Sequence, residues 1–152
     1  MSHEELLERL ADMPRRLREV ADGFQGDVRR RPSETAFSLL EHACHLRDIE
    51  LLAYERRITR MLSEEVPELE DVDGGRIARE ADYHAHEELE PALHAFAALR
   101  AANVAALQRL SDEEWTRTGV LEGAGTITIA DLAGRMAIHD SEHLAELRTL
   151  TA

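Results

Sequence analysis

Two histidines near the end of the chain, His139 and His143, lie four residues apart in the segment MAIHDSEHL. On a helix, residues at positions i and i+4 lie one above the other on the same face, so both rings could bind one metal ion. The spacing alone is weak evidence, because a chain with 8 histidines contains such pairs by chance. Whether the pair binds a metal therefore depends on which face of the helix it occupies and on whether a third ligand exists.

The pair falls in a segment that is predicted to be a helix over residues 129–150, with Thr128 as its N-cap and Asp131 in its first turn. At about 100° per residue, both histidines share one face with four apolar residues. These are Leu132, Met136, Leu147 and Leu150. Burying imidazoles among such side chains costs free energy unless each ring finds a hydrogen bond or a metal. The periodicity of this helix is compatible with either outcome.

A third candidate ligand lies in the segment SLLEHACHLRDIE, residues 38–50, which contains His42 and His45. The positions around His45 on a helix form a mainly polar strip. They are Ser38, Glu41, His42, Asp48, Ile49 and Leu52. If this strip faces the helix at 129–150, three imidazoles converge, with carboxylates near enough to orient them. Three histidines that leave coordination positions open to water are typical of a catalytic metal site. Periodicity alone accepts either His42 or His45 as the third ligand.

Four amphipathic helices would position these rings. They are predicted at residues 3–22, 38–61, 91–110 and 129–150. Pro14 falls inside the first helix and predicts a kink or a break. Ser38 and Glu41 match a capping box that begins the second helix, and Ser33 is a competing N-cap. With little strand signal, the sequence predicts an all-α four-helix bundle in a single domain, residues 1–152.

The segments between these helices carry turn signals. Residues 23–32 are predicted to be a loop, and residues 63–75, with Pro67 and paired glycines, a long connection between helices two and three. Residues 76–90 are predicted to be helical in part. Residues 111–114 predict a short capped turn, and residues 119–128 a loop or a small hairpin.

Composition excludes several classes of function. With 31 acidic and 18 basic residues and a net charge of −13, the surface should repel phosphate backbones, so we expect no nucleic-acid partner. No stretch approaches the roughly 20 apolar residues of a membrane span, and the start MSHEELLERL lacks the form of a signal peptide. We therefore expect a cytoplasmic protein without a membrane partner. The single cysteine, Cys44, excludes an intrachain disulfide and is expected to be a small core residue.

Several motifs together resemble the DinB/YfiT-like superfamily, over almost the whole chain. They are Phe37-Ser38, Glu41, His45-Leu46, Asp48 and Glu50, then Arg100, then LSDEEWTRTG at residues 110–119, then His139 and His143-Leu144. The resemblance implies a four-helix bundle, commonly dimeric, in which one histidine of the second helix and two of the fourth hold a divalent metal. Carried over to this chain, the ligands are His45, His139 and His143, rather than His42. The family often has tryptophan where this chain has Phe37, a difference that affects packing and not ligation.

The resemblance also implies a function. Characterised relatives include thiol-dependent S-transferases and isomerases, so we expect one divalent metal ion that activates a low-molecular-weight thiol toward a small-molecule electrophile. The metal could be zinc, nickel, iron or manganese, since imidazole suits several of them. The alternatives are a metal-dependent hydrolase and a non-catalytic metal-binding or stress-response bundle. No residue is assigned a catalytic role beyond the metal ligands.

The remaining polar candidates receive structural interpretations. Arg100 falls on the inward face of its helix and needs a carboxylate, for which Glu41, Asp48 and Glu50 are available. Three further histidines, His84, His86 and His94, are expected to be exposed. His3, near the terminus, is expected to be mobile.

The second helix also predicts assembly, because its apolar residues extend beyond one stripe. They are Leu39, Leu40, Ala43, Leu46 and Leu51. One bundle covers one broad stripe per helix, so part of this surface should need a partner. Because members of the family are commonly dimeric, this apolar surface predicts a two-fold homodimer. The alternative is that residues 63–75 or 119–125 fold over the surface.

Overall fold

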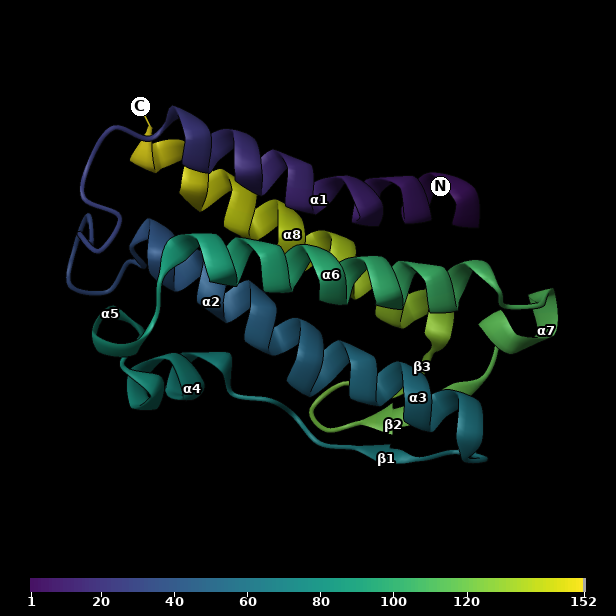
Figure 1. Ribbon diagram of the computed structural model, residues 1–152. Coiled ribbons are helices and arrows are strands. Elements are labelled where there is room, and N and C mark those ends of the chain that lie inside the picture. The colour runs from purple at the N-terminus through teal and green to yellow at the C-terminus, as the bar shows by residue number, and fades with distance from the viewer. Residues whose placement is uncertain (152) are drawn as a thin grey trace.

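Four long helices form the body of the protein (Figure 1). The computed structural model describes residues 1–151. The first helix is α1 (His3–Gly23), and the second is α2 (Leu39–Ile49), which continues through a π-helical segment, η1 (Glu50–Glu55), into α3 (Arg56–Ser63). The third is α6 (Leu89–Gln108), and the fourth is α8 (Ile129–Leu150). The predicted four-helix bundle is confirmed.

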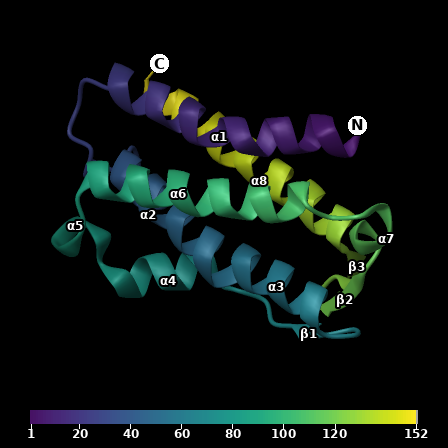
Figure 2. The same cartoon turned by 45° about the vertical axis from the view of Figure 1, so that its right-hand side comes forward.

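The order of the helices around the bundle differs from a simple up-and-down arrangement. Both α1 and α2 pack against α6 and α8, so the first two helices lie on opposite sides of the bundle. Figures 1 and 2 show α2 and α6 running in one direction, and α1 and α8 in the other. Parallel neighbours require a crossover along the length of the bundle. Residues 64–88 make this crossing and contain β1 (Glu68–Leu69), α4 (Gly74–Ala81) and α5 (Tyr83–His86), of which α4 and α5 pack against α2.

Local capping determines where three of the long helices begin. Ser2, Ser38 and Thr128 each form a complete capping box, in which the side chain accepts from a backbone N–H three residues on. Helix α2 therefore begins after Ser38, and the competing N-cap at Ser33 is not used. Helix α1 continues through Pro14, so the predicted break is absent.

The second helix is less regular than its periodicity predicts. From Glu50 to Glu55 the backbone follows a π-helix, whose wider turns contain more residues than α-helical turns. This segment lies just beyond His45 and changes which faces of α3 meet the rest of the bundle. The helix predicted over residues 38–61 is therefore in the correct place, but its residues 50–55 are π-helical and not α-helical.

A small sheet ties the crossover to the start of α8. Of the two interpretations of residues 119–128, the hairpin is correct: β2 (Thr118–Leu121) pairs antiparallel with β3 (Gly125–Thr128). Gly123 and Gly125 adopt φ values of +81° and +83° in its turn, a conformation that favours glycine. Strand β1 adds parallel to β2. The capped turn at 111–114 is α7 (Asp112–Trp115), and α6 begins two residues before Pro91.

The leucines that predicted a second subunit are covered by their own chain. Leu39, Leu40, Ala43 and Leu46 are all buried, in a cluster that includes Ala78 of α4 and Tyr83 of α5. Only Leu51 keeps substantial exposure, at 43%. The uncovered surface assumed for the homodimer is therefore wrong, because the same cluster draws residues from α1, α6 and α8 as well as from the crossover. Among residues 1–151, no helix has both the length and the apolar character needed to cross a membrane.

Candidate metal centre

His45 of α2 and His139 and His143 of α8 converge in the interior of the bundle. One ring nitrogen from each lies within 4.8 Å of those of the other two. His139 Nε2 and His143 Nε2 are 3.1 Å apart, and the His45 ring centroid is 4.9 Å from that of His143 and 5.5 Å from that of His139. The three residues predicted as ligands are therefore brought together by two helices.

The spacing of these nitrogens suits one divalent ion. Imidazole nitrogens bind zinc at about 2.0–2.1 Å, so two neighbouring ligands of one ion stand roughly 3.0–3.4 Å from each other. The 3.1 Å between His139 Nε2 and His143 Nε2 matches this separation. The nitrogen of His45 completes the group within 4.8 Å.

The electrostatics of the cluster keep its rings neutral. Burial lowers the pKa of His45 to about 4 and that of His143 to about 2, and neighbouring imidazoles act in the same direction. Burial also lowers the pKa of His139. Metal ligation requires neutral imidazoles, so the cluster is in the binding-competent protonation state near pH 7.

One nitrogen of the cluster has no partner in the protein. The Nδ1 atom of His139 is buried and makes no hydrogen bond within residues 1–151. Buried polar atoms are nearly always satisfied, so an exception calls for an explanation, of which a bound ion is one. His139 is held by its Nε2 contact with His143 and by packing against Tyr54, whose ring centroid is 6.2 Å away, while its Nδ1 stays without a partner.

Two neighbours hold the ring of His45. The backbone of Gly74, the first residue of α4, lies directly against the ring. Phe37 lies on another side, with ring centroids 5.3 Å from His45, 5.5 Å from His42 and 6.5 Å from His143. At the position where the family often has tryptophan, Phe37 therefore forms an aromatic wall beside these three imidazoles, but not beside His139.

A buried arginine connects the helices that carry the three rings. Arg100 of α6 donates to both oxygens of Glu50, at 3.0 and 2.9 Å, and to both oxygens of Asp140, at 2.7 and 2.9 Å. Asn103 also donates to Glu50, at 2.9 Å. The predicted inward Arg100 is correct, and Glu50 is its partner among the three carboxylates considered. Because Asp140 follows His139 directly, this ion pair holds α8 at the site.

Asp140 is the important residue that sequence reasoning missed. It lies between the two histidines of α8, and it is buried with 5% exposure. Its position beside the apolar stripe could have indicated a buried partner for Arg100. The other two carboxylates pair elsewhere: Glu41 accepts from Arg31, and Asp48 from Arg47.

His42 reaches the cluster from the far side of His143. Its Nδ1 lies 2.9 Å from His143 Nδ1, and its Nε2 lies 3.7 Å from Glu146 Oε2. Burial lowers its pKa to about 4. His45, and not His42, stands in the group that includes both His139 and His143.

Two of the remaining histidines differ from expectation. His84 is half-buried, with Nε2 2.8 Å from Ser38 Oγ and 3.4 Å from Glu41 Oε1, because α5 packs over the start of α2. His3 stacks on Trp115 at 4.1 Å between ring centroids, instead of being free. His86 and His94 are exposed as expected, and Cys44 is buried, with its thiol pKa raised to about 12.

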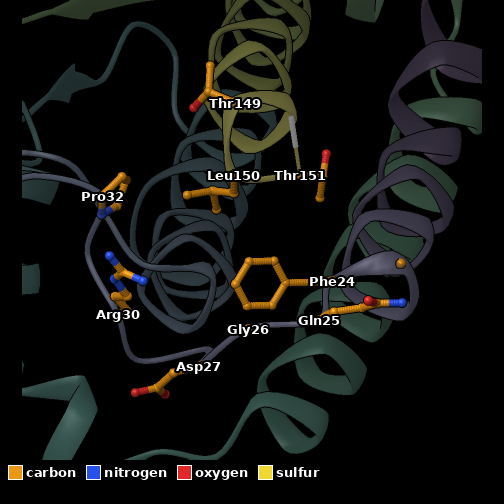
Figure 3. A pocket seen from close by; sticks show the side chains of 10 residues that line it. Phe24, Gln25, Gly26, Asp27, Arg30, Pro32, Thr149, Leu150 and Thr151 are labelled. Atoms are coloured by element: carbon orange, nitrogen blue, oxygen red, sulfur yellow. The ribbon is translucent and has the colours of Figure 1, made fainter.

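An open groove of about 720 Å³ has one histidine of the cluster, His139, in its lining. It runs between β3 and α8, and Ile127, Gly134, Arg135 and Ile138 line it with His139. A second hollow, of about 660 Å³, lies where the loop after α1 meets the end of α8, and the Phe24 ring projects into it (Figure 3). No histidine lines that hollow, so we assign solvent access to the groove at His139.

Comparison with known proteins places this architecture in a family. YfiT from Bacillus subtilis, described as a probable metal-dependent hydrolase with an unusual four-helix bundle topology, is similar in structure, with a TM-score of 0.88 and 18% identity. The match covers 99% of this chain and 88% of that chain, and at this identity it shows the shared fold. No curated protein matches the sequence. The model of the DinB superfamily matches residues 7–147, and this chain therefore belongs to the DinB superfamily.

Proposed function

We propose that this protein binds one divalent metal ion through His45, His139 and His143, and that it is a cytoplasmic metal-dependent enzyme acting on small molecules. The observation that carries the proposal is the convergence of three ring nitrogens within 4.8 Å, from two buried histidines, His45 and His143, and the partly buried His139. The lowered pKa values of these histidines support it, because neutral rings leave lone pairs for the ion. Zinc, nickel, iron and manganese are the candidate ions.

The reaction that we propose is transfer or isomerisation that depends on a low-molecular-weight thiol. A divalent ion held by three imidazoles lowers the pKa of a thiol or water that binds in its open positions. The chain supplies the surroundings. Phe37 and Tyr54 provide an apolar wall, the Arg100 network holds α8 in position, and the groove beside His139 admits the substrate.

Two alternatives make different use of the same site. A hydrolase would use water in place of the thiol, and the description of YfiT favours that candidate. A non-catalytic metal-binding bundle needs no route for a substrate. The open groove at His139 therefore argues for catalysis over simple metal storage.

Metal analysis tests the site directly. The protein, purified without a nickel column, should contain close to one equivalent of a divalent metal by elemental analysis. His45→Ala, His139→Ala and His143→Ala should each abolish binding, and exposed His94→Ala, the matched control, should retain it. Full binding by any of the three variants would remove that residue from the ligand set.

Activity is tested by combining thiols with electrophilic acceptors, and by offering hydrolysable esters without thiol. Turnover that requires the thiol favours the transferase or isomerase, and turnover without it favours the hydrolase. Gly134→Phe provides a probe of the groove, because no heavy atom lies within 4 Å of the Cβ position at residue 134. This variant should keep its metal and lose turnover. Unchanged turnover would exclude the groove as the substrate route.

A further inference from the structure

The two ring nitrogens of His143 face two different histidines. Its Nε2 lies 3.1 Å from His139 Nε2, and its Nδ1 lies 2.9 Å from His42 Nδ1. Both separations are hydrogen-bond distances, so in the metal-free protein each contact can hold a proton that one of its two rings donates. A neutral imidazole carries a single N–H, and the two contacts are therefore linked through the tautomer of His143.

Only one of the two possible arrangements suits a metal. If His42 donates to His143 Nδ1, the single proton of His143 sits on Nε2, the atom that faces His139 and the proposed ion. That nitrogen then has no lone pair to offer. If His143 instead donates from Nδ1 to His42, its Nε2 keeps the lone pair.

Glu146 favours the second arrangement. Its Oε2 lies 3.7 Å from Nε2 of His42, on the side of that ring away from His143. A carboxylate there favours a proton on His42 Nε2, because the N–H dipole points toward the negative charge. His42 then has a lone pair on Nδ1, which must accept from His143.

We propose that His42 is a positioning residue, which accepts a hydrogen bond from Nδ1–H of His143 and so keeps Nε2 of His143 free to bind the metal. The inference rests on the proposed metal site. Histidine ligands normally donate their second N–H to a carboxylate, a carbonyl oxygen or water, and in this chain an imidazole takes that place. His42 and His45 thus have different tasks: His45 binds the ion, and His42 orients another ligand.

The matched variants His42→Leu and His42→Asn test the hydrogen bond. Both side chains branch at Cγ and have similar shapes, but only asparagine presents an acceptor near the position of Nδ1. Zinc affinity, measured by competition with a chromophoric chelator, should fall about 10–100-fold in His42→Leu and recover most of that loss in His42→Asn. Wild-type affinity in His42→Leu, or equal losses in both variants, would overturn the role. Melting of the metal-free proteins shows that each variant is folded.

The tautomer gives a second readout, which general packing by His42 would not determine. Long-range ¹H–¹⁵N spectra of the zinc-loaded wild type should show the proton of His143 on Nδ1 and zinc on Nε2. Zinc on Nδ1 would overturn the proposal.

His139→Ala separates this inference from the proposed function. If the wild type binds zinc and His139→Ala does not, the metal site stands, and the His42 variants decide the positioning role alone. If His139→Ala binds as tightly as the wild type, the metal site itself is wrong and the inference fails with it.

Discussion

Gly74 packs so closely on His45 that a Cβ atom at residue 74 would lie 2.4 Å from Cε1 of the imidazole. The same Cβ would lie 3.0 Å from Cδ1 of Ile49. Residues essentially never approach this closely, so the first turn of α4 contacts the candidate ligand without an intervening side chain. The crossover between the second and third long helices thus forms one wall of the site.

We predict that Gly74→Ala weakens metal binding by displacing the His45 ring. Gly75→Ala is the matched control, because its Cβ would meet only Arg79 and Asp73, at 3.3 and 3.5 Å. Both substitutions add a methyl group to the same helical turn, and so change helix propensity alike. Titration with zinc should show a loss of affinity for the first variant only. Equal affinities would mean that His45 shifts without leaving the site.

Arg100 should be essential for stability. Arg100→Met leaves Glu50 and Asp140 buried without their cation, so we expect the free energy of unfolding to fall by roughly 3–5 kcal/mol. Arg76→Met removes a partner of Glu80 on the surface and should leave the free energy of unfolding nearly unchanged, because water screens an exposed ion pair. Urea denaturation of both variants measures the difference. Similar small effects would show that the buried carboxylates take up protons and tolerate the loss.

The histidine cluster should make the metal-free protein sensitive to mild acid. Burial lowers the pKa of His42 and of His45 to about 4 and that of His143 to about 2, from the ordinary 6.5. Above pH 6.5 these rings are neutral in both states. As the pH falls below 6.5, the unfolded chain takes up protons and the folded chain does not, so the free energy of unfolding decreases.

The slope should reach at most about 1.4 kcal/mol per pH unit for each of these histidines. Denaturation between pH 7.5 and 5, with a chelator present, measures it before most carboxylates titrate. His42→Asn removes one of the rings and should reduce the slope. A stability that does not change over this interval would contradict the prediction.

A homodimer remains a prediction from the family resemblance alone, since the leucines first assigned to its interface are buried within the chain. Sedimentation of the wild type at micromolar concentration should give close to twice the chain mass of 17.1 kDa. A single species at the chain mass would contradict it.

The sequence by itself determined the helices and the identity of the candidate ligands. Capping boxes at Ser38 and Thr128 and the apolar periodicity of residues 129–150 are local, because their interactions join residues three or four apart. The positions of His139 and His143 on one face follow from the same spacing. The choice of His45 over His42 needed the family motifs, because periodicity accepted either.

Only the tertiary structure decided which side chains meet between elements. An apolar stripe shows which face of a helix is buried, but it does not show which neighbour covers it. The packing of α1, α6, α8 and the crossover around α2 buries Leu39 and Leu40, and the crossover brings Gly74 to His45. The same packing joins Arg100 to Asp140, 40 positions away in the chain, and turns His42 toward His143. These contacts depend on how distant helices are arranged in space, which the spacing of residues within a single helix does not specify.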